Sequence, residues 1–322
     1  MKPHSCLRSC AVAILLILLL HITAGAVSRS APLAALMIYA QTGKVVSSRP
    51  VPEETENCIV PTIQITQPTR PAEEAPEAVF SFSAEDLSLI GIRYQADIRP
   101  DAAQLLLSSF TPSLGEASPA VLIVHTHTTE SYADVYDRVN FRTLDEQKNM
   151  LAIGDAVARV LEMGGITVIH DRTVHDYPDY NTAYSAARRT IQGYLARYPD
   201  ICIVLDLHRD ASADETSPMV TAATVGGQSA AQLMMVVGCG TESDPIPNWQ
   251  ENFALALKLA VLLEQENPGI TRPMAVCPKR YNLDLSPGSL LVEVGAAGNT
   301  LQEALIAGDA LGRAILALAD MQ

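Results

Sequence analysis

The stretch Val121-Leu122-Ile123-Val124-His125-Thr126-His127-Thr128-Thr129-Glu130 decides how this chain is interpreted. Its first four residues are aliphatic and favour a buried β-strand. Three side chains that can bind a transition metal, those of His125, His127 and Glu130, follow where the strand should end. In open α/β sheets the ligand crevice lies outside the carboxyl ends of the strands. The stretch therefore predicts a metal site at a strand end.

The segments that follow alternate between apolar strands and helices. Strands are expected at residues 121–124, 166–169, 201–207, 233–237 and 290–294, with a hairpin partner for the fourth at 219–225. Helices are expected at residues 144–163, 182–198, 249–264 and 300–318. This alternation favours right-handed crossovers and a parallel sheet covered on both faces. We therefore predict an α/β domain over residues 118–322, in three layers, with a mainly parallel, twisted sheet flanked by helices.

The N-terminal residues have the pattern of a targeting segment. Lys2 and Arg8 lie in residues 1–9, a cytoplasmic n-region, and residues 10–27 are largely apolar. This pattern is typical of a secretory signal and also of an uncleaved membrane anchor. Both interpretations place the remaining chain outside the cytoplasm, and the second anchors it to the cell membrane. Residues 28–117 are rich in proline and are interpreted as a spacer whose local structure the sequence leaves open, with a more apolar part at residues 79–110 that could hold a strand or helix.

The composition argues against two classes of site. The 322-residue chain has a formal net charge of −14 at pH 7. Nucleic acid is bound by a basic face that neutralises phosphates, so a nucleic-acid partner is not expected. The six cysteines include no Cys-x-x-Cys pair, so a zinc site built from thiolates is not expected either.

Two further strands carry ionisable residues in apolar surroundings. The third strand continues as Asp206-Leu207-His208-Arg209-Asp210, and the last strand contains Glu293. A charged group in a buried strand is costly unless it is paired or binds a metal. Because the strand ends of one sheet share an edge, these residues are expected to meet the first cluster in one cleft.

Each of these residues has a predicted role. A catalytic zinc ion usually takes three protein ligands and keeps one position for water, and His127, Glu130 and His208 form such a set. Glu293 is predicted to be the general base. Arg209 is predicted to stabilise an oxyanion or to hold a substrate carboxylate. Asp206 and Asp210 are predicted to orient the histidines or the arginine through hydrogen bonds.

Two assignments stay open. His125 and His127 are two residues apart and would face the same side of an extended strand, so both could bind metal. Only His127 has the spacing to Glu130 that a single zinc ion can close, which favours a supporting role for His125. His175-Asp176 follows the second strand and is interpreted either as a supporting or substrate-binding pair, or as a loop histidine beside an Asp cap.

Six segments resemble stage II sporulation protein P, a peptidoglycan hydrolase of endospore-forming bacteria. They are VLIVHTHTTESY from Val121, TVHDYPDYNTAY from Thr173, YPDICIVLDLHRDA from Tyr198, QLMMVVG from Gln232, NWQENFALALKLA from Asn248 and YNLDLSPGSLLVEVGAAGNTLQEAL from Tyr281. The resemblance covers the chain from about Pro119 onward. The pair Ala296-Ala297 departs from the pattern in a Gly-rich turn near the site.

The resemblance implies a zinc-dependent N-acetylmuramoyl-L-alanine amidase, with endopeptidase activity also ascribed to the family, and a fold similar to cell-wall amidases. It implies that peptidoglycan is the substrate and that the protein acts with stage II sporulation proteins D and M at the engulfing septal membrane. In the amidases a His, a Glu and a second His bind zinc and a late Glu is catalytic. These roles correspond to His127, Glu130, His208 and Glu293.

Two other functions compete with this one. A metal-dependent phosphoesterase would begin with His125-x-His127, and would need more carboxylates and a second metal ion. A membrane-tethered scaffold that binds peptidoglycan without cleaving it would need none of the predicted ligands. Metal content and turnover discriminate among the three.

Overall fold

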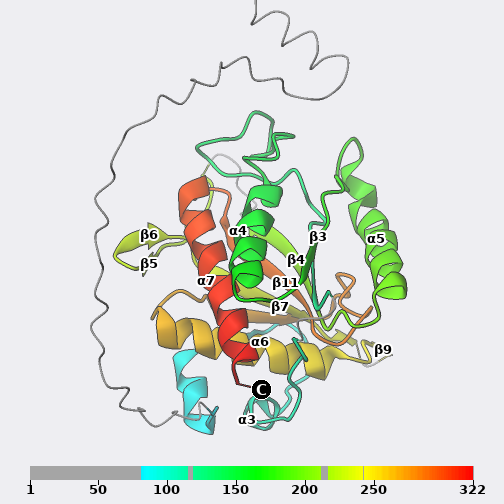
Figure 1. Cartoon of the computed structure of the whole chain (residues 1–322), viewed down its shortest axis with the longest axis vertical. Helices are drawn as coiled ribbons and strands as arrows, with labels where there is room; N and C mark the ends of the chain where they lie inside the picture. The colour runs from blue at the N-terminus through cyan, green and yellow to red at the C-terminus, as the bar shows by residue number, and fades with distance from the viewer. Residues whose placement is uncertain (1–80, 115–118, 212–216, 242, 322) are drawn as a thin grey trace, which may run out of the picture. The chain divides into compact units, whose positions relative to one another are not determined.

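The computed structural model describes residues 81–114, 119–211, 217–241 and 243–321, all in the compact unit Glu74–Gln322 (Figure 1). The predicted targeting segment at residues 1–27 and the predicted spacer up to residue 80 lie outside these residues. Within the described ranges, no helix combines the length and apolar character needed to cross a membrane.

A seven-stranded sheet organises the unit. In spatial order its strands are β1 (Ile92–Tyr94), β10 (Met274–Cys277), β7 (Leu233–Gly238), β11 (Ser289–Ala296), β4 (Ile203–Asp210), β2 (Val121–Val124) and β3 (Val168–His170). All neighbouring strands are parallel except β11 and β7, which are antiparallel. The prediction of a mainly parallel sheet is confirmed.

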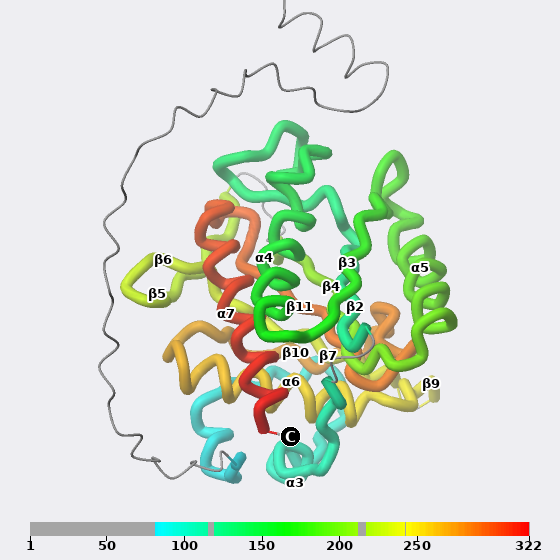
Figure 2. Tube along the Cα trace, in the orientation of Figure 1, coloured from blue at the N-terminus to red at the C-terminus, as the bar shows by residue number. Residues whose placement is uncertain are grey.

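Helices cover both faces of the sheet (Figures 1 and 2). The helices on one face are α4 (Met150–Met163), α6 (Trp249–Glu266) and α7 (Leu301–Ala319), and α5 (Ala183–Arg197) lies on the other. Leu205 and Leu207 of β4 belong to the large core under the first group. Val204 packs instead in a smaller cluster with Ile191 of α5. Successive β4 residues therefore serve opposite faces, as strand geometry requires.

Short elements complete the unit. They are η1 (Ala84–Leu89), α3 (Ala102–Leu106), η2 (Tyr180–Thr182), and the two-stranded pairs β5 (Ala223–Val225) with β6 (Gln228–Ala230) and β8 (Gly240–Thr241) with β9 (Asp244–Pro245). The predicted pairing of residues 219–225 with the fourth strand is wrong, because β5 pairs with β6 in a separate sheet.

Other differences from the prediction concern where elements begin. Helix α4 begins at Met150, six residues later than expected, because the Asn149 side chain accepts a hydrogen bond from Leu151 N and caps it. Strand β10 was not predicted. Strand β1 lies within the predicted spacer and adds an edge to the same sheet.

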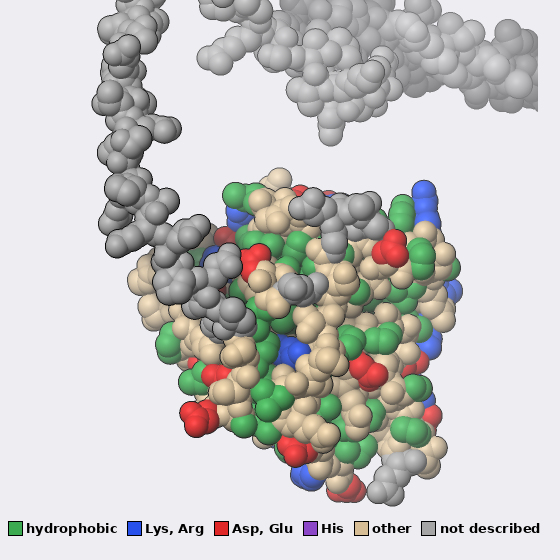
Figure 3. Space-filling view, turned by 60° about the horizontal axis from the view of Figure 1, so that its bottom comes forward, with side chains coloured by type: hydrophobic (Ala, Val, Ile, Leu, Met, Phe, Trp, Pro, Cys, Tyr) green, Lys and Arg blue, Asp and Glu red, His purple; other side chains and the backbone are tan. Residues whose placement is uncertain are grey.

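The face of the molecule drawn in Figure 3 carries charges of both signs. Its Asp and Glu side chains and its Lys and Arg side chains are scattered among hydrophobic and polar ones. Among the described side chains in this view, the basic ones form no continuous surface.

Candidate active site

The predicted site residues converge because three strands end at one edge. Strands β2, β4 and β11 run in the same direction, with Val124 opposite Asp206 and Glu293 opposite His208. Side chains alternate along β4, so Asp206 and His208 share a face with Glu293, on the side of the sheet that α5 covers. The carboxyl ends of these strands thus gather groups that are up to 166 residues apart, from His127 to Glu293.

Glu130 enters the site on a turn that closes directly after β2, where its backbone N–H donates to His127 O at 3.1 Å. Its buried carboxylate accepts from the backbone N–H of Arg209 at 3.2 Å and lies 3.5 Å from His208 Nδ1. Burial opposes ionisation, but Arg209 and His208 outweigh it and hold the pKa of Glu130 well below its usual range. Glu130 is therefore an anion within the cluster.

His208 stands between two carboxylates. Its Nε2 lies 2.9 Å from Asp206 Oδ1 without hydrogen-bond alignment, and its Nδ1 faces Glu130. Asp206 is itself fixed by Thr126, whose backbone N–H and hydroxyl donate to it at 2.8 and 2.6 Å. Burial disfavours the imidazolium, but Asp206 and Glu130 raise the pKa of His208 well above its ordinary value.

His127 is enclosed by aromatic rings. It stacks on Tyr180 with 4.3 Å between ring centroids, and it meets His208 edge-on at 5.3 Å. Tyr184 also meets it edge-on, at 5.4 Å. Burial is the main cause that lowers the pKa of His127, so the ring is held neutral, the form that binds metals.

Glu293 is the least satisfied carboxylate of the group. Its side chain is partly buried, and its Oε2 is fully enclosed without a hydrogen-bond partner. Burial raises the pKa of Glu293 to about 8, and His208 acts in the opposite direction. At neutral pH the group therefore holds a proton that it can give or take, which suits a general acid–base residue.

This shift predicts a pH-dependent stability for the protein without bound metal. The folded state keeps the Glu293 proton up to about pH 8, whereas an unfolded Glu releases it near pH 4.5. The folded protein is therefore fully stable with respect to this group below pH 4.5, where Glu293 is protonated in both states. Its free energy of unfolding falls as the pH rises toward 8, because the unfolded chain releases the proton and the folded chain keeps it. We expect Glu293→Gln, which mimics the protonated form, to match the parent near pH 4.5 and to be more stable by about 1–3 kcal/mol at pH 8.

Urea unfolding of the chelator-treated protein at pH 4.5, 6 and 8 measures this difference. Glu162→Gln changes an exposed glutamate of α4 and serves as the matched control, with no pH-dependent gain expected. An equal stability of parent and Glu293→Gln at all three pH values would contradict the placement of Glu293.

The two arginines beside the cluster hold its loops in place. The guanidinium of Arg209 donates to three backbone carbonyls, those of Ser131, Asn140 and Phe141. These contacts hold the loop beside the Glu130 turn, and the role of Arg209 in stabilising an oxyanion or holding a substrate carboxylate stays a prediction. Arg142 was not predicted, because it lies in an irregular loop.

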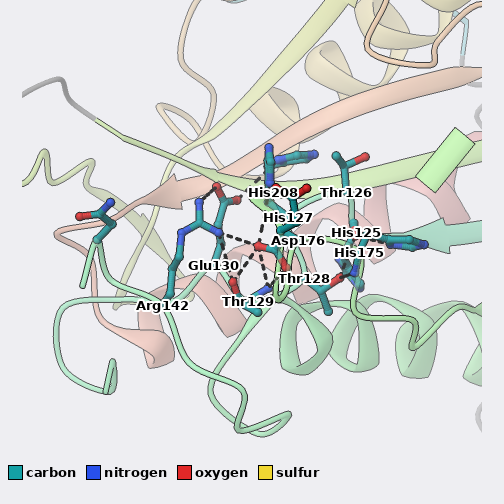
Figure 4. Close-up of polar contacts among 12 residues, drawn as sticks. His125, Thr126, His127, Thr128, Thr129, Glu130, Arg142, His175, Asp176 and His208 are labelled. Carbon is teal, nitrogen blue, oxygen red and sulfur yellow. Dashed lines mark hydrogen bonds and ion pairs between the residues drawn. The ribbon is translucent and has the colours of Figure 1, made fainter. Parts of the chain in front are cut away.

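Arg142 connects the predicted pair His175-Asp176 to the cluster. Its Nη1 donates to Asp176 Oδ2 at 2.6 Å and its Nη2 lies 3.6 Å from Glu130 Oε1, beside the Tyr180 ring (Figure 4). Asp176 also accepts from the backbone N–H and hydroxyl of Thr129 at 3.1 and 2.7 Å, and lies 3.9 Å from His127 Nδ1. These contacts place Asp176 beside His127 and next to the Glu130 turn, which is compatible with the predicted supporting role.

His125 lies apart from this cluster. Its Nδ1 contacts Leu207 O at 3.2 Å and its Nε2 lies 2.9 Å from His170 Nε2, so both ring nitrogens are engaged beneath α4. The expectation that His125 and His127 face the same side fails because β2 ends at Val124 and the chain turns. A Cβ atom at Gly154 of α4 would clash with both histidine rings, which shows how closely the helix approaches them.

The remaining predicted residues are engaged elsewhere. His175 contacts His125 O and Thr190 Oγ1, each at 2.9 Å, which fits the interpretation of a hydrogen-bonded loop histidine. Figure 4 shows His125 and His175 on one side of Asp176, and Glu130 and Arg142 on the other. Asp210 forms an ion pair with Arg272 at 2.8 Å.

Tyr180 and Tyr184 were also missed by the sequence analysis. They stand four residues apart, Tyr180 in η2 and Tyr184 in the first turn of α5, a spacing that places both rings on one side of the continuous helical path. That spacing is the signal that could have indicated them as a wall of the site.

The donor chemistry of the cluster fits zinc. Six buried side-chain nitrogen or oxygen atoms lack a hydrogen-bond partner among the described residues, and three of them belong to His127, His208 and Glu293. With the carboxylate of Glu130, which lies 3.5 Å from His208, the imidazoles of His127 and His208 make up the ligand types of catalytic zinc sites. The described residues include no group of three or more His, Cys, Asp or Glu already arranged around a metal position. Glu130 is instead drawn toward Arg142 and Arg209.

The fold and the site define an α/β protein with a His/Glu cluster at the ends of parallel strands. Residues 54–316 match the family described as Stage II sporulation protein P (SpoIIP), and the chain belongs to this family. The resemblance noted in the sequence is confirmed.

Among curated proteins, the chain is similar to Stage II sporulation protein P of Bacillus subtilis (strain 168). The two are 29% identical over 198 residues, which cover 57% of this chain and 47% of the relative. The chain thus spans about half the length of the curated relative that it matches.

Among solved structures, the unit is similar to two amidases. The N-acetylmuramoyl-L-alanine amidase AmiC2 of Nostoc punctiforme is 14% identical with a TM-score of 0.38, over 62% of this chain and 95% of that one. The CwlD amidase from Clostridioides difficile, solved in complex with the GerS lipoprotein, is 12% identical with a TM-score of 0.41, over 62% and 96%.

Proposed function

We propose that this SpoIIP-family protein is a zinc-dependent peptidoglycan hydrolase. Its reaction is cleavage of the amide between N-acetylmuramic acid and L-alanine, with stem-peptide cross-links as additional targets, during engulfment in sporulation. The observation that carries the proposal is the convergence of His127, Glu130, His208 and Glu293 at one sheet edge, with three orphaned polar atoms among them.

His127, Glu130 and His208 are the residues that would hold zinc. Bound there, the ion would act as a Lewis acid and lower the pKa of a water molecule toward neutrality. Asp206 contacts the second nitrogen of His208 and fixes the orientation of its ring, as carboxylates beside metal-binding histidines do. Arg209 holds the Glu130 turn through its backbone N–H and its guanidinium.

Glu293 supplies the proton transfers. Its carboxyl group faces the cluster from the neighbouring strand, and its raised pKa keeps proton affinity high at neutral pH. In this proposal the ionised form of Glu293, which is in equilibrium with the protonated form near neutral pH, takes a proton from the attacking water and delivers it to the nitrogen of the leaving L-alanine. Tyr180 and Tyr184 flank His127 and limit the access of bulk water to the reacting groups.

The cellular setting is part of the same proposal. Residues 10–27 would anchor the chain to the cell membrane, and the spacer predicted within residues 28–117 would extend the hydrolase toward the wall. The site then acts outside the cytoplasm at the engulfing septum, and stage II sporulation proteins D and M are the candidate partners.

The competing enzyme function has less support. A phosphoesterase site starting at His125-x-His127 needs both rings on one side, but His125 contacts Leu207 and His170 beneath α4. The scaffold alternative leaves Glu293 as a costly buried carboxylate with no chemical use.

Digestion of purified peptidoglycan by the full chain tests the proposal. With zinc we expect release of peptides that carry a free N-terminal L-alanine, and treatment with a chelator should reduce that release by about a hundredfold or more. Readdition of zinc should restore it. Absence of new L-alanine amino termini in mass spectra of the products, from a zinc-loaded and folded chain, would refute the amidase function.

A further inference from the structure

A pocket of about 550 Å³ lies directly beside the candidate site. Its walls include residues 138–142, Tyr177, Tyr180 and Arg209, and it shares Glu130 and Asp176 with the site. Its volume lies within the range of small-molecule binding sites and is large enough for a short peptide. His127, His208 and Glu293 do not line it, so it neighbours the reacting groups without containing them.

The pocket lining holds one positively charged side chain more than it holds carboxylates. Of its three arginines, Arg142 binds Asp176, and Arg209 donates to backbone carbonyls beside Glu130. These two cations balance the two carboxylates of the pocket. Arg138 is the third, and its guanidinium is exposed: its closest carboxylate is that of Asp137, where Nε lies 3.9 Å from Oδ1.

The surroundings of Arg138 resemble a prepared binding surface. Its guanidinium lies over the Tyr177 ring, 5.1 Å from the centroid, which leaves the edge of the group free to face a ligand. Tyr177 and Tyr180 are 49% and 50% exposed, so both rings are open to a ligand in the pocket. An arginine edge between exposed rings fits a planar carboxylate on an otherwise partly apolar ligand.

The shape of the pocket is fixed by the site itself. Asn140 and Phe141 both adopt left-handed backbone conformations, with φ of 60° and 51°. Their carbonyl oxygens accept hydrogen bonds from the guanidinium of Arg209, at 2.7 and 3.2 Å. Strained backbone that is held by surrounding contacts is typical of preorganised ligand sites.

We propose that this pocket binds a free carboxylate on the peptide part of the substrate and that Arg138 selects it. The inference rests on the proposed function for the identity of the substrate, and it deepens that function by assigning the pocket to the peptide side of the scissile amide. The selected group is the free carboxylate of the residue that follows L-alanine, and the corresponding amide is discriminated against.

Two soluble probes that differ in one group test this selectivity. They are N-acetylmuramoyl-L-alanyl-D-glutamate and N-acetylmuramoyl-L-alanyl-D-isoglutamine, each with its γ-carboxyl blocked as a methylamide, so that the first keeps one free carboxylate on the residue after L-alanine and the second has an amide in its place. Binding is measured by calorimetry on the zinc-loaded full chain carrying Glu293→Gln, so that turnover does not interfere. We expect the carboxylate probe to bind about tenfold more tightly, because a charge-assisted pair to arginine is lost in the amide.

Adding Arg138→Gln should weaken binding of the carboxylate probe by about tenfold and leave that of the amide probe unchanged. Arg159→Gln is the matched control, because Arg159 is an exposed α4 arginine paired with Asp309 outside the pocket, and it should change neither affinity. Equal affinities for the two probes, or an equal loss for both in Arg138→Gln, would overturn the inference.

The two proposals fail separately. Probe selectivity without release of L-alanine termini from peptidoglycan would contradict the hydrolase function and keep the carboxylate pocket. Release of those termini without probe selectivity would keep the hydrolase and remove the pocket assignment.

Discussion

Replacement of Glu293 by glutamine is expected to lower kcat for peptidoglycan cleavage by about a thousandfold, within the range that general acid–base residues contribute. The amide keeps the size of the side chain but can neither accept nor deliver the proton. Zinc content and fold should be unchanged, because Glu293 is not among the predicted ligands and its buried oxygen already lacks a partner. Initial rates of L-alanine terminus formation measure the effect.

Asp210→Asn is a suitable control for this experiment. Asp210 ends the adjacent strand β4 but forms an ion pair with Arg272, so its replacement should change kcat by only a few fold. A Glu293→Gln chain that retains more than a tenth of the parental kcat would remove Glu293 from the reaction.

Replacement of His127 should weaken zinc binding, whereas replacement of His125 should leave zinc bound. We expect His127→Ala to lower zinc affinity by at least about a hundredfold and to abolish activity, because the ion would lose one of three protein ligands. His125→Ala should retain about one zinc per chain, since both of its ring nitrogens already contact Leu207 O and His170.

Metal content after dialysis against a zinc buffer distinguishes the two variants, with circular dichroism as the test that each is folded. His125→Ala should unfold at a lower temperature than the parent, because it leaves a buried carbonyl and a buried ring without their contacts. Loss of zinc in His125→Ala together with its retention in His127→Ala would reverse the assignment of the ligand.

Sequence pattern predicted the central part of the fold well. The aliphatic runs that became β2, β4 and β11 are continuous and buried, so their periodicity is unambiguous. The antiparallel orientation of β7 against β11 was not foreseen, because the β5–β6 hairpin that precedes β7 redirects the chain. Strand β10 is only four residues long and follows Pro273, so its signal was weak.

The sequence indicated the strand-end residues of the candidate site, but it did not indicate the residues that loops bring to the site. His208 and Glu293 interrupt apolar strands, which makes them conspicuous in the sequence. Arg142 reaches Glu130 and Asp176 only through the path of the loop at residues 133–149, which no local pattern encodes. For the same reason the sequence did not indicate the hydrogen bonds that the guanidinium of Arg209 donates to backbone carbonyls at Ser131 and Asn140.

Gly154 has a consequence for engineering this domain. A glycine inside a helix costs about 1 kcal/mol relative to alanine, and exchanging the two is a common route to greater heat resistance. In α4 that route is closed, since the rings of His125 and His170 occupy the space that a methyl group would need. Efforts to stabilise the helix should therefore leave position 154 untouched and begin at its exposed end, at Glu162 and Met163.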